Sequence, residues 1–64
     1  MNVELIRLPP GVPFVLDGNI YYREFATQFG LVKVCPVRKG IVDFKRPKYF
    51  DNNLVVCKYE HKRI

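Results

Sequence analysis

Positively charged and aromatic side chains alternate in the second half of this 64-residue sequence. Residues 45 to 50 read Lys-Arg-Pro-Lys-Tyr-Phe. Because phosphates need positive charge and nucleobases need a flat surface, this mixture is typical of a site for single-stranded nucleic acid or a nucleotide. The residues expected to contact such a polyanion are Lys33, Lys45, Arg46, Lys48, Tyr49 and Lys58. In the alternative interpretation, Tyr49 and Phe50 fill the core and the lysines only maintain solubility.

The net charge of +5 is distributed unevenly along the chain. Residues 1–32 hold two basic and three acidic side chains, a net charge of −1. Residues 33–64 hold nine basic and three acidic side chains, a net charge of +6. Since a concentrated positive field attracts anions, the second half is the part expected to meet an anionic partner.

Catalytic groups are scarce. The chain has no serine, and its only threonine is Thr27. Cys35 or Cys57 with His61 would be the one available pair of nucleophile and base, but His61 lies four residues from the end of the sequence, where chains tend to be mobile. No paired carboxylates stand out. The sequence therefore predicts a binding protein and not an enzyme.

Cofactor, metal and membrane signals are also missing from the sequence. The four glycines are isolated and suit turns, not a phosphate-binding loop. Two cysteines and one histidine are too few for a four-ligand zinc site. A secreted domain of this size usually carries four or more cysteines, so both thiols are expected to be free and packed inside a cytoplasmic protein. No apolar run approaches the roughly 18 residues that span a bilayer.

Short runs rich in Val, Ile, Tyr and Phe alternate with Gly, Pro, Asn and Asp along the whole chain. This pattern predicts a single, mostly β domain over residues 1–64, either an antiparallel sheet or a small SH3-like or OB-like barrel of five to six short strands. Leu54 to Glu60 is expected to pair with an earlier strand, and Leu5 to Leu8 to add another. Arg23 to Phe29 is either a short helix or the end of a strand followed by a bend.

The turn at Asp17-Gly18 decides which side chains of the first hairpin share a face. A two-residue turn would pair Phe14 with Tyr21 and mix polar with apolar residues on both faces. A turn with one extra, bulged residue would pair Phe14 with Ile20 and give one apolar face, so it is preferred. Tyr21 and Arg23 would then lie on the outer face, as a contact for a protein partner or a second copy of the chain. Alternatively, the N-terminal strand covers them.

The same bulged turn at residues 37–40 would place Val34 opposite Phe44 and Lys33 opposite Lys45. The expected apolar face consists of Val32, Val34, Pro36, Val42 and Phe44. Like charges directly opposite each other destabilise a sheet, so an anionic partner would relieve the pair of lysines. Because proline cannot donate a ladder hydrogen bond, Pro36 predicts an edge strand or a missing N–H that points outward.

Residues 8–23 contain a Leu-Pro-x-Gly-x-x-Phe opening, an Asp-Gly turn and a Tyr-bearing strand, and a second hairpin follows. This arrangement resembles a pattern in small uncharacterised proteins of tailed bacteriophages. The resemblance implies a compact β-barrel accessory protein of phage or prophage origin that acts in the host cytoplasm. Besides nucleic-acid binding, it suggests a host-takeover or anti-defence inhibitor that binds a host protein or sequesters a signalling nucleotide. An interaction module in a phage particle, forming a homo-oligomer, is a third possibility.

Overall fold

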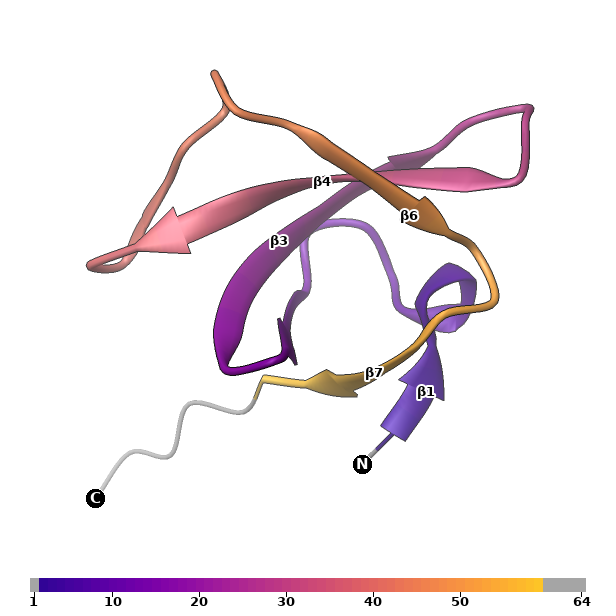
Figure 1. Ribbon diagram of the computed structural model, residues 1–64, viewed down its shortest axis with the longest axis horizontal. Coiled ribbons are helices and arrows are strands. Elements are labelled where there is room, and N and C mark those ends of the chain that lie inside the picture. Colours follow the sequence, from indigo (N-terminus) through magenta and orange to yellow (C-terminus); the bar gives the residue numbers. More distant parts are fainter. Residues whose placement is uncertain (1, 60–64) are drawn as a thin grey trace.

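The computed structural model describes residues 2–59 as seven strands and one short 3-10 helix (Figure 1). In chain order these are β1 (Asn2–Glu4), η1 (Leu5–Arg7), β2 (Pro13–Leu16), β3 (Asn19–Ala26), β4 (Leu31–Arg38), β5 (Ile41–Val42), β6 (Lys48–Asp51) and β7 (Val55–Lys58). All pairings between strands are antiparallel. The predicted mostly β fold is confirmed, with seven strands instead of five or six, and the sheet is not closed into a barrel.

The strand order β1-β7-β2-β3-β4-β5, with β6 also on β4, brings the first and last strands together. β7 lies between β1 and β2, so the predicted pairing of the last strand with an earlier one is confirmed (Figure 1). The backbone N–H groups of Leu5 and Ile6 donate hydrogen bonds to the carbonyls of Leu54 and Asn52, at 2.8 and 2.9 Å. These two bonds attach η1 to the turn between β6 and β7.

The segment from Leu5 to Leu8 was expected to be a strand, and this prediction is wrong. β1 ends at Glu4, and η1 follows at once. Residues three apart share one face of a 3-10 helix. Leu5 and Leu8 therefore both reach the core, although they could not lie on one face of a strand.

The first hairpin uses the two-residue turn, so the preferred bulged register is wrong. Asp17 and Gly18 both have positive φ angles, 51° and 79°, and Phe14 pairs with Tyr21. Such a turn matches the right-handed twist of the flanking strands, and Asp-Gly is among the sequences that favour it. The Phe14 and Tyr21 rings stack at 5.6 Å between centroids. Tyr21 therefore belongs to the core. Polar and apolar residues remain mixed on the other face of the hairpin.

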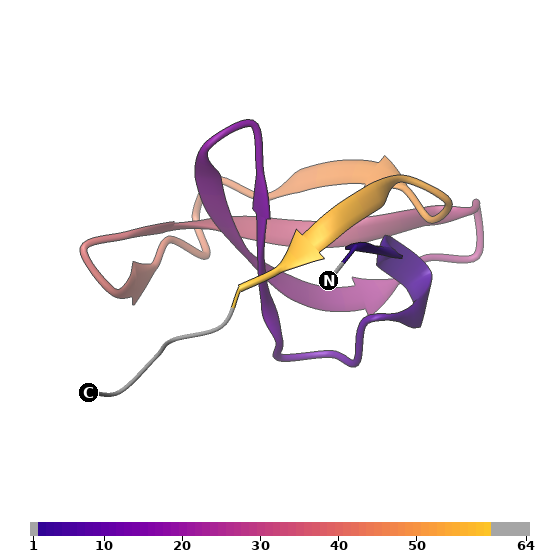
Figure 2. The ribbon, with the colours of Figure 1, turned by 90° about the horizontal axis from the view of Figure 1, so that it is seen from below.

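The second hairpin also uses a two-residue turn, at Lys39-Gly40, with φ angles of 52° and 77°. Val37 pairs with Val42 and Arg38 with Ile41, so the predicted partner of Val37 moves by one residue. The hairpin projects from one end of the molecule in both views (Figure 1, Figure 2).

Pro36 lies in β4, opposite the point where the chain leaves the sheet after β5. Its carbonyl accepts a hydrogen bond from Asp43 N–H at 2.9 Å. The N–H and C=O groups of one strand residue point to the same side of the strand. The N–H that proline lacks would therefore point to the side of β4 that faces Asp43, between the residues paired with β5 and those paired with β6. β4 is not an edge strand, since β3 pairs with its other side. Of the two alternatives for Pro36, the edge strand is therefore wrong, and an N–H position that points away from the paired strands is the one that fits.

Residues 43–47 loop out, and β6 then pairs with the first half of β4. Tyr49 lies opposite Lys33, and Lys48 opposite Val34. The predicted pair of Lys33 and Lys45 does not exist. Phe44, expected in the core, is 59% exposed.

The segment from Arg23 to Phe29 is the end of a strand followed by a bend, which selects the second of the two predicted alternatives. β3 continues to Ala26 after an irregularity in its pairing with β4. The turn that follows is closed by a hydrogen bond of 2.7 Å from Thr27 N–H to the carbonyl of Leu31. It lies at the opposite end of the molecule from the β4–β5 hairpin (Figure 1).

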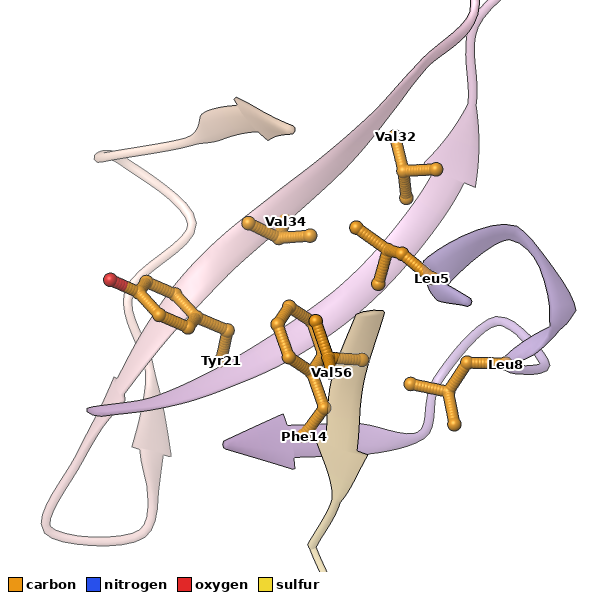
Figure 3. Close-up of a cluster of buried hydrophobic side chains, with 7 residues drawn as sticks. All are labelled: Leu5, Leu8, Phe14, Tyr21, Val32, Val34 and Val56. Carbon is orange, nitrogen blue, oxygen red and sulfur yellow. The ribbon is translucent and has the colours of Figure 1, made fainter. Parts of the chain in front are cut away.

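One small apolar core lies inside the curled sheet (Figure 3). Strands β2, β3, β4 and β7 and the segment around η1 supply its buried side chains, which are Leu5, Leu8, Phe14, Tyr21, Val32, Val34 and Val56. Full burial of such a side chain stabilises a fold by about 1.5–3 kcal/mol. A domain this short has little else to oppose the conformational entropy of the chain, so each core residue matters strongly to stability.

Candidate anion-binding groove

A groove of about 350 Å³ lies where β3 begins and β4 ends, and we call it the anion groove. Its lining residues are Asn19, Ile20, Tyr21, Pro36, Val37, Arg38, Arg46 and Lys48. Three of them are cations, and none is an acid. A hollow lined by one sign of charge concentrates the field and attracts ions of the opposite sign.

The pairing of β3 with β4, the second hairpin turn and the loop at 43–47 build this groove. The pairing sets Tyr21 opposite Pro36, and the turn at Lys39-Gly40 follows directly after Arg38. The loop then carries Arg46 and Lys48 back to the same region. Segments far apart in sequence thus supply the three cations.

Tyr21 links the anion groove to the core. Its ring packs between Phe14 and Phe50, with the Phe50 ring edge-on at 5.5 Å. Figure 3 shows its hydroxyl pointing away from the other core side chains. The Lys48 ammonium lies 5.7 Å from the centre of the Tyr21 ring, a distance at which a cation is attracted to the ring face. The core therefore helps to hold Lys48 at the groove.

The three cations differ in how far they are already neutralised. Arg46 Nε lies 3.8 Å from Asp43 Oδ2, in an exposed pair of a kind that contributes little energy. Within residues 2–59, no carboxylate forms an ion pair with Arg38 or Lys48. Both charges are therefore available to a ligand.

Of the eight residues expected to bind a partner, the structure brings three together in the anion groove: Tyr21, Arg46 and Lys48. Lys45 is exposed on the loop that carries Arg46, and Lys58 is exposed on β7, opposite Phe14. Tyr49 is half exposed on β6. The charged surface expected for a polyanion is therefore divided among several places.

Lys33 is already neutralised by a neighbouring strand. Its ammonium lies 3.5 Å from Glu24 Oε2 and 5.3 Å from the centre of the Phe25 ring. The sequence argument for an anionic partner at Lys33 rested on repulsion from Lys45. Because Lys33 pairs with Glu24 and does not lie opposite Lys45, that argument no longer applies.

Arg23 was expected on the surface and is instead 4% exposed. Burial lowers its pKa. One terminal nitrogen donates to the Glu24 carbonyl, while Nε has no hydrogen-bond partner among the described residues. Since Tyr21 is also buried, the exposed Tyr-Arg surface predicted on the first hairpin is not present.

Arg38 is the groove cation that was not expected to bind a polyanion, since the sequence placed it at a hairpin tip as a contact for a host protein. The signal was present in Lys39-Gly40, because a two-residue turn there places Arg38 at the end of its strand and close to the loop that follows. The bulged register predicted other neighbours for Arg38 and so did not reveal the groove.

Cys35 and Cys57 are both free, as predicted, but only Cys35 is packed. The Cys35 thiol donates a hydrogen bond to Glu24 Oε2 at 3.1 Å. Burial, together with this bond and the charge of Glu24, raises the pKa of Cys35 to about 11. Cys57 is exposed, so its predicted packing is wrong.

Thiol labelling of the native protein at pH 8 is expected to modify Cys57 and spare Cys35. The thiolate is the reactive form, and Cys35 is both covered and protonated at that pH. Mass spectrometry of peptides after labelling with iodoacetamide measures the two sites. Labelling in denaturant provides the control, since both thiols should then react. Equal labelling of both residues under native conditions would contradict the buried position of Cys35.

Within residues 2–59, no group of three or more His, Cys, Asp or Glu side chains could hold a metal ion. His61, considered above as a catalytic base, lies outside the described residues. The described part of the chain also has no helix that is long and apolar enough to cross a membrane. Comparisons with protein families, with curated proteins and with solved structures found no match.

Proposed function

We propose that this protein is a non-catalytic binder of nucleic acid or another polyanion. The observation that carries the proposal is the anion groove, in which Arg38, Arg46 and Lys48 meet without any acidic lining residue. Like charges brought together in a marginally stable domain oppose folding. An anion bound among them would remove that repulsion. The groove is therefore expected to bind phosphates.

The resemblance to small bacteriophage proteins supports an origin in a phage or prophage and action in the host cytoplasm, as parts of the same proposal. The inhibitor alternative depended on contacts through Tyr21, Tyr22 and Arg23 and through the hairpin tips at 17–18 and 38–40. The tips are exposed, but Tyr21 and Arg23 are buried and Tyr22 is half-buried, so the Tyr-Arg part of that contact is lost. Nucleic-acid binding is therefore the better supported function.

The dependence of binding on salt tests this proposal. Fluorescence anisotropy of labelled single-stranded and duplex oligonucleotides, at rising KCl, should show affinity that falls steeply as salt increases. Three phosphate contacts release enough counterions for a slope of log K against log salt of about −2 on a single strand. Heparin should compete. The proposal would be overturned if binding were undetectable at low salt, or if the affinity did not change with the salt concentration.

A further inference from the structure

Phe44 stands between two further hollows. On one side, a hollow of about 330 Å³ is lined by Tyr22, Arg23 and Phe25 among others. On the other side, a hollow of about 530 Å³ is lined by Arg38, Ile41 and Lys45 among others. Phe44 contributes to both. Its ring is fixed by an edge-to-face contact with Tyr22, at 5.8 Å and 79°. More than half of the residue nevertheless remains exposed.

One of the two hollows shares a wall with the anion groove. Arg38 lines both the anion groove and the hollow that also holds Lys45, and Phe44 lines that hollow and the other one. Two exposed cations, Arg38 and Lys45, therefore lie on one side of an exposed aromatic ring. The loop at 43–47 connects this ring directly to the anion groove, since Phe44 and Arg46 are two residues apart.

The two acidic residues in these hollows already have partners. Asp43 faces Arg46 and accepts the backbone N–H of Lys45. Glu24 faces Lys33 and accepts the Cys35 thiol. Arg38 and Lys45, in contrast, are exposed and form no ion pair among residues 2–59. The charge left for a ligand in this region is positive.

We propose that the bound polyanion is a single-stranded nucleic acid, whose phosphates lie in the anion groove and one of whose bases stacks on Phe44. This inference rests on the proposed function. Bases of a duplex are stacked inside it, whereas those of a single strand are free to lie against an exposed ring. Base–aromatic stacking tolerates any sequence, so the protein should bind single strands with little sequence preference.

Variants of Phe44 test the stacking directly. Phe44→Ala removes the ring, and Phe44→Leu keeps an apolar contact for Tyr22 while removing the flat surface. Phe29→Ala is the matched control, since Phe29 is 79% exposed and lies in the turn at the other end of the molecule (Figure 1). Circular dichroism should show that all three variants remain folded.

Affinity is measured by anisotropy for oligothymidine and oligouridine of about 12 residues, within the site size of small β domains. A duplex of equal length and inorganic polyphosphate serve as the other ligands. The wild type should prefer the single strands to the duplex. Both Phe44 variants should bind the single strands about 10-fold more weakly. Polyphosphate has no bases, so its binding should not change, and the salt slope should stay the same.

Equal affinity for single strand and duplex would overturn the inference. So would Phe44 variants that bind single strands as well as Phe29→Ala does. In both cases the proposed function survives, because the protein still binds polyanions. If neither oligonucleotides nor polyphosphate bind at low salt, the proposed function fails, and the stacking inference fails with it.

Discussion

Phe14→Ala is expected to leave most of the protein unfolded at 25 °C. Phe14 is fully buried and contacts the Tyr21 ring. Removing a buried phenylalanine side chain costs about 3–5 kcal/mol, and the total stability of so small a domain is about 3–5 kcal/mol. The two quantities are similar, so the variant should have almost no net stability.

Urea denaturation followed by far-ultraviolet circular dichroism measures this effect. Phe29→Ala is the control, because the same change at an exposed position should alter the free energy of unfolding by less than about 0.5 kcal/mol. A Phe14→Ala protein with a wild-type urea midpoint would show that the core drawn in Figure 3 does not hold the fold together.

Replacing the three groove cations together, as Arg38→Ala, Arg46→Ala and Lys48→Ala, is expected to lower the affinity for single-stranded nucleic acid about 100-fold at about 0.1 M salt. The estimate assigns one phosphate contact to each cation, and each contact on a single strand contributes about 0.7 to the salt slope. The slope itself should approach zero. Anisotropy titrations at several KCl concentrations measure both quantities.

A second triple variant separates the groove from the total charge. Arg7→Ala, Lys39→Asn and Lys58→Ala remove three positive charges from exposed residues outside the anion groove. Asparagine at position 39 suits the positive φ angle of that turn. This protein should keep most of its affinity and its salt slope. Equal losses in the two triple variants would show that binding follows net charge and not the anion groove.

Two of the three groove cations could be anticipated from composition. The sequence places Arg46 and Lys48 in a cationic, aromatic segment, and both line the anion groove. Tyr21 was also selected, but for an exposed position that it does not occupy. Arg38 was expected only at the tip of the second hairpin, because its place in the groove depends on the two-residue turn at Lys39-Gly40.

The sequence by itself determined the mostly β fold, the positions of the turns and the basic second half. These follow from local properties: β-branched and aromatic residues favour strands, and Gly with Asp or Asn breaks them. The tertiary structure alone decided the register. A shift of one residue exchanges the two faces of a strand, and Asp17-Gly18 is compatible with either turn. Packing of Tyr21 against Phe14 and Phe50 settled that choice. The same register buried Arg23, and the pairing of β3 with β4 placed Lys33 beside Glu24. The positive charge of the anion groove therefore comes from Arg38, Arg46 and Lys48 instead.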